Sequence, residues 1–162
     1  MSDLRVGQGF DVHPFSDDGS RPLVLGGVEF AGERGLTGHS DSDVVAHAVA
    51  DALLGAAGLG DIGQLFPDTD PALAGADSIA ILADIAARVR AAGWTPVNVD
   101  CTVVLEAPKV APRRGEMQQN LSAAAGCDVT VKGKRAEGLG ALGRREGIAC
   151  VAVALVERSG AT

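Results

Sequence analysis

The chain of 162 residues carries 14 Lys and Arg against 21 Asp and Glu, a formal net charge of −7, and 46% of its residues are hydrophobic. This length and composition are typical of one globular domain, here residues 1–162, and exclude a disordered or fibrous chain. The acidic balance, with no Tyr and one Trp, argues against binding to nucleic acid or to anionic membranes. No apolar run approaches the ~20 residues that cross a bilayer. The chain begins without a basic and apolar leader and has three widely spaced cysteines, so we expect a cytoplasmic protein.

Hydrophobic spacing and turn residues predict the elements in chain order. The first half predicts a strand over 4–12, a strand over 22–30 that is bent or bulged at its glycines, a helix from 44 to about 55, a loop over 61–76, and a helix that Asp77 or Ser78 caps and Gly93 ends. The second half predicts a strand over 97–105, a weaker helix over 112–125, a short strand over 129–132 and a buried strand over 148–156.

Strands separated by helices predict an α+β fold, an α/β sandwich in which helices pack on a sheet. The predicted order is two strands, two helices, one strand, one helix and two strands. In a doubly wound fold, strands and helices would alternate strictly. We therefore expect a mixed sheet of four to five strands with three helices on one face.

The sharpest local feature is Asp11-Val12-His13 on the first predicted strand. Residues i and i+2 of a strand point to the same face, so the carboxylate and the imidazole project together. On the first helix, Asp43, His47 and Asp51 share one face. Asp11, His13 and His47 therefore suit a zinc site with an open fourth position, and Asp43 or Asp51 would orient His47. The alternative is a set of polar surface residues near loops, because the Asp-x-His pattern is short.

Three further segments suit phosphate or ribose binding. The acidic loop over 60–70 could meet ribose hydroxyls or a phosphate-bound metal, or it could be a surface turn. Lys109 offers a cation after a strand. The basic, glycine-rich stretch over 132–147 could cradle an anion, or it could be a solvated loop.

Taken together and in order, the motifs closely resemble the 2-C-methyl-D-erythritol 2,4-cyclodiphosphate synthase family over about residues 5–157. The motifs are Gly9-Phe10-Asp11-Val12-His13, Gly38-His39-Ser40-Asp41-Ser42-Asp43-Val44, His47-Ala48, Asp51-Ala52-Leu53-Leu54-Gly55, Gly60-Asp61-Ile62-Gly63, Phe66-Pro67-Asp68-Thr69-Asp70, Gly75-Ala76-Asp77-Ser78, Asn98-Val99-Asp100, Ala107-Pro108-Lys109, Gly143-Arg144 and Glu146-Gly147-Ile148-Ala149.

The resemblance implies an enzyme of non-mevalonate isoprenoid biosynthesis. Such enzymes convert 4-diphosphocytidyl-2-C-methyl-D-erythritol 2-phosphate to the 2,4-cyclodiphosphate and CMP, a phosphorus–oxygen lyase reaction. The family forms homotrimers whose subunits pack by their sheets around a threefold axis, with active sites between neighbours. A cavity on that axis can hold an isoprenoid diphosphate.

The resemblance also implies roles for individual residues. Asp11, His13 and His47 would bind zinc, and Glu137 would bind a second divalent cation, Mg²⁺ or Mn²⁺. His39 and Arg135 would be the catalytic pair. Substrate contacts would come from Asp11, His13, His39, Ser40, Asp61, Ile62, Gly63, Phe66, Asp68, Asp70, Leu105, Pro108, Lys109, Ala111, Lys134, Glu137, Ala141 and Arg144.

The chain departs from the family pattern in one stretch. Lys134-Arg135-Ala136 stands where the family has threonines, and Arg135 aligns with the threonine thought to stabilise the transition state. Ala141 replaces an aromatic residue and Arg145 a glycine. There are two alternatives to the lyase. The altered segment would support a non-catalytic trimer that binds an isoprenoid or nucleotide diphosphate. The other alternative is a zinc hydrolase of another substrate with Asp43 or Asp51 as its base.

Overall fold

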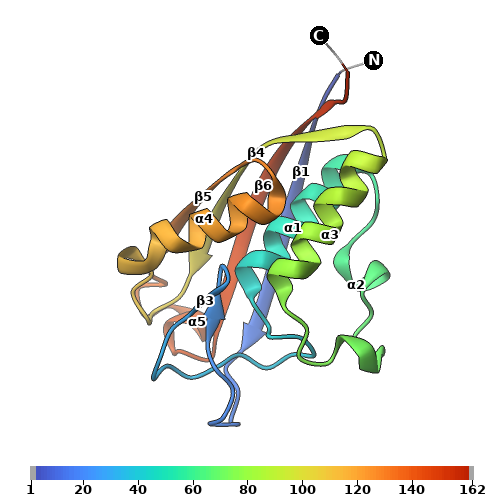
Figure 1. Cartoon of the computed structure of the whole chain (residues 1–162). Helices are drawn as coiled ribbons and strands as arrows, with labels where there is room; N and C mark the ends of the chain where they lie inside the picture. Colours follow the sequence, from blue (N-terminus) through green and yellow to red (C-terminus); the bar gives the residue numbers. More distant parts are fainter. Residues whose placement is uncertain (1–2, 161–162) are drawn as a thin grey trace.

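The computed structural model describes residues 3–160 and consists of a four-stranded sheet with helices packed on one face (Figure 1). The strands are β1 (Leu4–Pro14), β4 (Trp94–Val104), β5 (Asp128–Lys134) and β6 (Gly147–Arg158), in the spatial order β1-β6-β4-β5. β6 is antiparallel to both of its neighbours, whereas β4 and β5 run parallel. The sheet is therefore mixed, as predicted, with β1 and β5 at its two edges.

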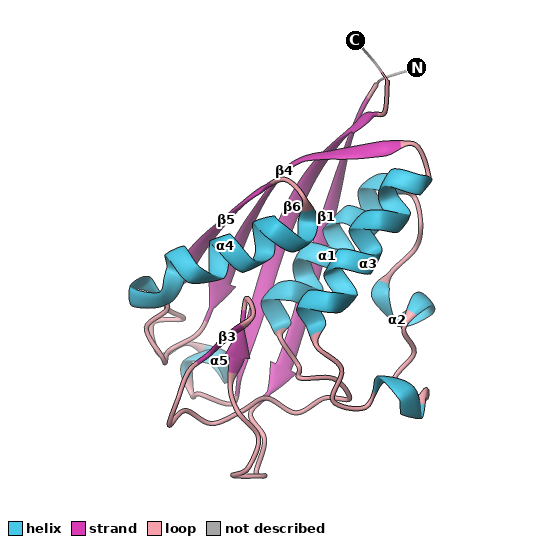
Figure 2. Ribbon diagram, viewed as in Figure 1, coloured by secondary structure: helices cyan, strands magenta, loops and turns pink. Residues whose placement is uncertain are grey.

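The three long helices lie on the same side of the sheet (Figure 2). They are α1 (Val44–Ala57), α3 (Ser78–Ala91) and α4 (Arg114–Ala125). Helix α1 packs against β1 and β6, α3 against α1 and β4, and α4 against β5. This arrangement confirms the predicted α+β class and the three helices on one face.

Two segments differ from the sequence prediction. The predicted bent strand over 22–30 is a hairpin of β2 (Val24–Leu25) and β3 (Val28–Glu29). Gly26 and Gly27 both adopt positive φ, 59° and 70°, as a two-residue hairpin turn requires. The predicted loop over 61–76 contains the short helix α2 (Ile62–Leu65) and a 3₁₀ turn at Pro71–Leu73. A second 3₁₀ turn, Ala111–Arg113, precedes α4, and the short helix α5 (Gly140–Gly143) precedes β6.

Helix α1 lies directly on β1 because two strand positions lack side chains. A Cβ added at Gly7 would collide with the backbone of Ala52 and Ala56, and one added at Gly9 would collide with the carbonyl of Ala48. Gly7 and Gly9 face the same side of β1 as Asp11 and His13. The close approach therefore brings the first turns of α1 to the strand positions that carry those two side chains.

The two faces of the sheet differ in what covers them. Between the sheet and the helices lies the core, whose largest fully buried side chains include Leu53, Leu82, Ile85, Met117, Leu121 and Ile148. No described helix covers the other face, which exposes Val6, Phe10, Val12, Val151 and Val153 at 37–67% of their surface. An exposed apolar patch on a soluble chain usually marks an interface.

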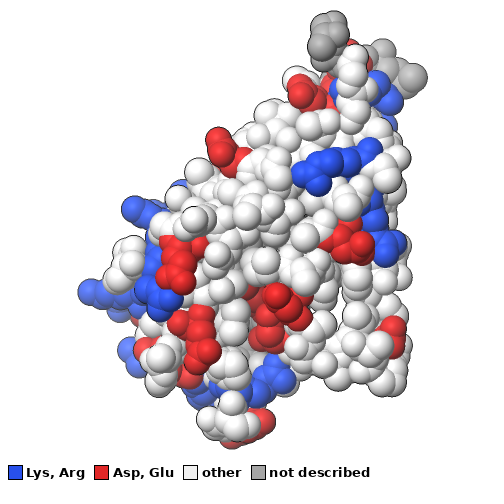
Figure 3. All heavy atoms as spheres, viewed as in Figure 1, with Lys and Arg blue, Asp and Glu red and all other residues white. Residues whose placement is uncertain are grey.

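The charges on the helical face are of mixed sign. Acidic and basic side chains are interspersed over that face, with uncharged surface between them (Figure 3). Among the described residues, the structure contains no helix that is long and apolar enough to cross a membrane.

Candidate active site

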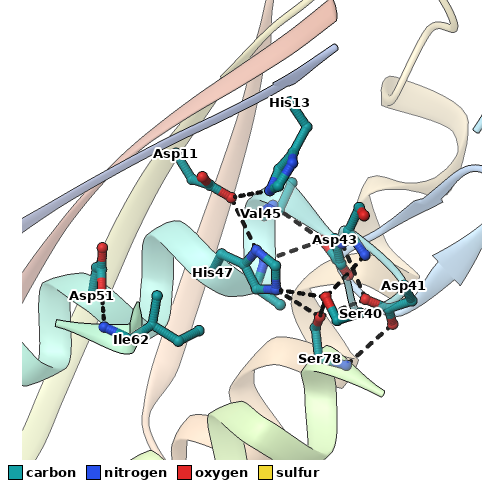
Figure 4. A network of polar contacts seen from close by, with 12 residues as sticks. Asp11, His13, Ser40, Asp41, Asp43, Val45, His47, Asp51, Ile62 and Ser78 are labelled. Carbon is teal, nitrogen blue, oxygen red and sulfur yellow. Dashed lines mark hydrogen bonds and ion pairs between the residues drawn. The ribbon is translucent and has the colours of Figure 1, made fainter. Parts of the chain in front are cut away.

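Asp11, His13 and His47 converge on one point beside the edge strand β1 (Figure 4). Asp11 Oδ2 lies 3.0 Å from His13 Nε2 and 3.0 Å from His47 Nδ1. The three potential ligand atoms lie within 4.8 Å of one another. Strand β1 supplies two of the groups through its i, i+2 spacing, and α1 supplies the third from its first turn. The predicted zinc ligands are therefore brought together by the fold.

The remaining nitrogen of each imidazole is held by an acceptor. His13 Nδ1 lies 2.8 Å from the carbonyl oxygen of Thr37, which can only accept, so this nitrogen carries the proton. His47 Nε2 lies 2.8 Å from the hydroxyl of Ser78. In the neutral tautomers that these contacts favour, two bare nitrogens and a carboxylate oxygen face one another. Three acceptors at such distances require a cation between them, and two imidazoles with one carboxylate are a donor set that suits zinc.

The protonation equilibria reflect the same convergence. Burial alone would raise the pKa of Asp11, but its hydrogen bonds to His13 and His47 and their charges lower that pKa well below its usual value. Burial alone would lower the pKa of His13, whereas the hydrogen bond and the charge of Asp11 raise it. The Asp11 carboxylate therefore favours positive charge on the group that faces it.

The prediction that Asp43 or Asp51 orients His47 is wrong, because both carboxylates are engaged elsewhere. Asp43 is fully buried and accepts backbone N–H bonds of 2.7–3.1 Å that cap α1 and fix the β2–β3 turn; the donors are Gly26, Gly27, Val45 and Ala46. Asp51 accepts from the Ile62 N–H at 2.7 Å and ties α2 to α1. Burial raises the pKa of both carboxyl groups against the effect of these N–H donors. Neither is placed to act as a general base at the metal cluster.

A cavity of about 200 Å³ opens beside the cluster. Its walls bring together seven of the predicted site residues, which come from β1, the loop before α1, α1 itself and the segment that contains α2. These residues are His13, His39, Ser40, His47, Ile62, Phe66 and Asp68, and Gly38, Leu73 and Ile81 complete the lining.

Three further predicted residues, Asp61, Gly63 and Asp70, lie around this cavity without lining it. The carbonyl of Asp70 accepts from His39 Nε2 at 2.7 Å, which fixes the segment before the 3₁₀ turn. Asp61 caps α2 by accepting from the backbone N–H of Gln64 at 2.9 Å and from its side-chain amide at 2.8 Å. Gly63 lies within α2, next to Ile62.

A second and larger pocket, of about 440 Å³, lies beside the other edge strand, β5. It contains six predicted residues, contributed by the segment after β4 and by the end of β5. They are Leu105, Pro108, Lys109, Ala111, Lys134 and Arg135, and the other lining residues are Glu106, Ala107, Val110, Arg114, Gly133 and Arg145. Backbone groups and cations here surround a largely apolar floor, which suits a base attached to phosphate.

Glu106 organises one wall of this second pocket. Its Oε2 accepts from the guanidinium of Arg135 at 3.0 Å, and its Oε1 accepts from the Gly138 N–H at 3.1 Å. These hydrogen bonds, first that from Gly138 and then that from Arg135, lower the pKa of Glu106. Glu137, held between the two donors, adopts a positive φ of 54°. The turn that carries Arg135 and Glu137 is thus fixed from the segment that follows β4.

The predicted residues do not form one cavity within a single chain. The two pockets share no lining residue and lie next to opposite edge strands. Glu137, Ala141 and Arg144 line neither of them, and Arg144 pairs with Glu146 at 2.6 Å.

The sequence prediction also missed several residues that support the site. Thr37, Asp41, Ser78 and Glu106 hold the side chains that would meet the metal or substrate. Arg21 donates to the Leu36 and Ser40 carbonyls, both at 2.8 Å, and so fixes the loop of His39 and Ser40. Ser78 had a sequence signal as a helix cap and as part of a family motif, but neither signal gave it a role at the site; the backbone carbonyl of Thr37 had no signal.

Comparison with known proteins agrees with this geometry. The model of the YgbB family matches residues 4–157. A 2-C-methyl-D-erythritol 2,4-cyclodiphosphate synthase of Bordetella petrii is 59% identical over 159 residues, which are 96% of this chain and 97% of that protein. The synthase of the same name from Azoarcus sp. is 55% identical and also covers 96% of this chain and 97% of its own length.

Solved structures of similar proteins share the fold. The bifunctional IspDF from Campylobacter jejuni superposes with a TM-score of 0.90 at 40% identity, covering 96% of this chain. This chain spans 42% of that bifunctional protein, less than half its length. A CDP complex of IspF from Plasmodium falciparum superposes with a TM-score of 0.84 at 32% identity and covers 99% of both chains.

Proposed function

Because the chain belongs to the YgbB family, it is a 2,4-cyclodiphosphate-forming, CMP-releasing lyase of non-mevalonate isoprenoid biosynthesis, and we propose how its residues carry that reaction. The substrate is 4-diphosphocytidyl-2-C-methyl-D-erythritol 2-phosphate. An oxygen of the 2-phosphate attacks the terminal phosphorus of the diphosphate, and the bond from that phosphorus to the bridging oxygen breaks. CMP leaves with that oxygen. No protein nucleophile is needed, so the residues act by positioning and charge stabilisation.

The metal cluster carries this proposal. Asp11, His13 and His47 hold zinc at the wall of the smaller cavity, with a side open to the substrate diphosphate. Zinc bound there supplies a Lewis acid for the reacting phosphate. His39 and Ser40, on the same cavity wall, contact phosphate oxygens, and His39 stabilises the charge that develops on them.

Glu137 would hold a second divalent cation, Mg²⁺ or Mn²⁺, which would supply positive charge beside the substrate diphosphate. A hard oxygen ligand next to substrate phosphates is typical of such cations. Arg135 and Lys134, at the wall of the larger pocket, neutralise the leaving phosphate. A guanidinium at position 135 is a stronger anion ligand than the hydroxyl that the family has there.

The nucleotide lies across the two pockets. Cytosine enters the larger pocket, where Leu105, Pro108, Lys109 and Ala111 supply backbone groups, an apolar floor and a cation. The other predicted substrate contacts are Asp61, Ile62 and Gly63 at the ribose, Phe66, Asp68 and Asp70 along the methylerythritol phosphate, and Ala141 near the diphosphate. The CDP complex of the Plasmodium falciparum relative supports a cytidine nucleotide as the ligand.

We also propose that the protein is a homotrimer with its active sites between subunits. The metal cluster and the nucleotide pocket lie at opposite edge strands, so a substrate that needs both would use one from each of two neighbouring chains. The open face of the sheet offers the apolar surface for that contact. Arg144 would lie near the threefold axis, where an isoprenoid diphosphate could bind.

Residues 1–162 would act as one cyclodiphosphate synthase domain in the cytoplasm. The family match over 4–157 supports a single catalytic unit. Cys101, Cys127 and Cys150 are all free in the structure, which suits a reducing compartment.

The direct test incubates the protein with its substrate, Zn²⁺ and Mg²⁺ and follows the phosphorus NMR spectrum. We expect CMP and the cyclic diphosphate to form in equal amounts, and His47→Ala to abolish both. Binding of CMP without any cyclic product would contradict the lyase and leave a trimer that binds diphosphates. Hydrolysis to an acyclic phosphate would indicate a zinc hydrolase instead.

A further inference from the structure

We propose that Ser78 and Asp41 are positioning residues for the metal ligand His47, because they fix which of its ring nitrogens carries the proton. The inference deepens the proposed function and depends on its zinc-ligand assignment. It concerns neither the ligands themselves nor the substrate contacts, but a partly buried chain of hydrogen bonds behind the site (Figure 4).

The chain begins at the side of the imidazole that faces away from the metal cluster. His47 Nδ1 lies 3.0 Å from Asp11, whereas Nε2 lies 2.8 Å from the Ser78 hydroxyl. Ser78 is 1% exposed. The Ser40 hydroxyl lies 3.3 Å from the same Nε2, a weaker contact than that of Ser78. Nδ1 is therefore the ring nitrogen that can bind the metal. The hydrogen-bonding partner of Nε2 must come from the protein.

The direction of each hydrogen bond follows from the carboxylate at the end of the chain. Asp41 can only accept, and it accepts from the Ser78 hydroxyl through Oδ1 and from the Ser78 N–H through Oδ2 at 3.1 Å. A serine hydroxyl has one hydrogen. Once this hydrogen is given to Asp41, the Ser78 oxygen can only accept from His47, so Nε2 carries the proton and Nδ1 keeps its lone pair.

Local structure explains why these residues meet. Ser78 is the first residue of α3, which Asp77 caps. Asp41 lies in the turn before α1 and also accepts from the Asp43 N–H at 3.1 Å. Asp41 thereby links the N-termini of α1 and α3, and it places Ser78 directly behind the ligand on α1.

For the other imidazole ligand, His13, a backbone group rather than a side chain fixes the position of the proton. His13 Nδ1 donates to the backbone carbonyl of Thr37, which no side-chain substitution removes. His47 depends on a hydroxyl, which a substitution does remove. Without the Ser78 hydroxyl, the tautomer with the proton on Nδ1 becomes competitive, because that proton can bond to Asp11. This tautomer cannot bind the metal.

Loss of such a partner typically lowers metal affinity by ~10–100-fold. We expect Ser78→Ala to weaken Zn²⁺ binding by that factor, measured by competition with a chromophoric chelator at constant pH. Ser78→Thr keeps the hydroxyl and should stay within about threefold of the unmodified protein by the same reasoning. The matched control is Ser122→Ala, because Ser122 on α4 also accepts a hydrogen bond, from Val129 N at 2.9 Å, but lies outside the site.

A second readout separates positioning from a loss of folding. In zinc-loaded protein with ¹⁵N-labelled histidine, the Nε2 proton of His47 should exchange slowly with solvent, and in Ser78→Ala it should exchange fast. The thermal midpoint of each metal-free variant reports folding, and if Ser78→Ala does not fold, Asp41→Asn supplies the comparison. Unchanged zinc affinity and unchanged exchange in a folded variant would overturn the positioning role alone. Failure of the unmodified protein to bind zinc would overturn the zinc site as well.

Discussion

The Glu106 carboxylate accepts a hydrogen bond from the Arg135 guanidinium at 3.0 Å, across the wall of the larger pocket. The resemblance to the family aligns Arg135 with a threonine expected to stabilise the transition state. A free arginine has many rotamers, so a charged residue at this position would not by itself replace a fixed hydroxyl. The contact with Glu106 restricts the guanidinium to the side of the pocket where phosphate is expected.

Replacing Arg135 should therefore affect the rate of reaction rather than the fold. We expect Arg135→Ala to lower kcat by ~10²–10³-fold, the usual effect of removing one group that stabilises developing charge. Arg135→Lys should retain part of the rate, because it keeps the charge but not the paired donors. Steady-state kinetics of CMP release would measure both. An Arg135→Ala variant with unchanged kcat would show that the guanidinium takes no part in the chemical step.

The Glu106 contacts should also make stability depend on pH in the acid range. Hydrogen bonds from Gly138 and Arg135 lower the pKa of Glu106 in the folded protein below the usual value of a free glutamate. The stabilisation is therefore complete above that value and is lost as the pH falls through the lower, folded pKa. Urea unfolding between pH 6 and pH 3 should show a smaller acid loss for Glu106→Gln than for the unmodified protein. Parallel pH profiles for the two proteins would contradict this assignment.

The sequence predicted correctly that Asp11 and His13 would project together, because their geometry is local. The i, i+2 spacing places Asp11 and His13 on one face of a strand, and that rule needs no tertiary information. The same reasoning failed for Asp43 and Asp51. Helical spacing predicts that both residues share a face with His47. It does not reveal that backbone N–H groups of the β2–β3 turn bind the Asp43 carboxylate, or that an N–H group of α2 binds the Asp51 carboxylate.

The residues that support the site were beyond sequence reasoning for a related reason. Ser78 and Asp41 are 37 positions apart and meet only because α1 and α3 begin side by side. Glu106 and Arg135 meet through the parallel pairing of β4 with β5, which a chain-order reading does not reveal. The strands and long helices were predictable because their hydrophobic period is strong, whereas α2 has four residues and no such period.

The close contact between β1 and α1 gives a prediction about the geometry of the metal cluster. Gly9→Ala would place a methyl group against the Ala48 carbonyl and should destabilise the fold by about 1–3 kcal/mol, as overpacking does. It should also weaken Zn²⁺ binding, because α1 carries His47 and β1 carries Asp11 and His13. Urea unfolding and chelator competition measure the two effects. Gly19→Ala is the control, since nothing lies within 4 Å of its added Cβ, and it should change neither quantity.

The open face of the sheet gives a prediction about assembly. Val6 is 67% exposed on the outer face of β1, so a charged side chain there costs a single chain little. In a trimer packed by its sheets, the same charge would be buried without a partner, which is strongly unfavourable. We therefore expect Val6→Asp to remain folded but to dissociate, with the mass from light scattering falling from three chains to one. Activity should fall with the mass, because each active site would lose the half that a neighbour contributes.

Ala83→Asp, on the exposed side of α3, should leave both the mass and the activity unchanged. A Val6→Asp protein that keeps the mass of three chains would show that the trimer does not use this face. One that dissociates with full activity would show that a single chain holds a complete site.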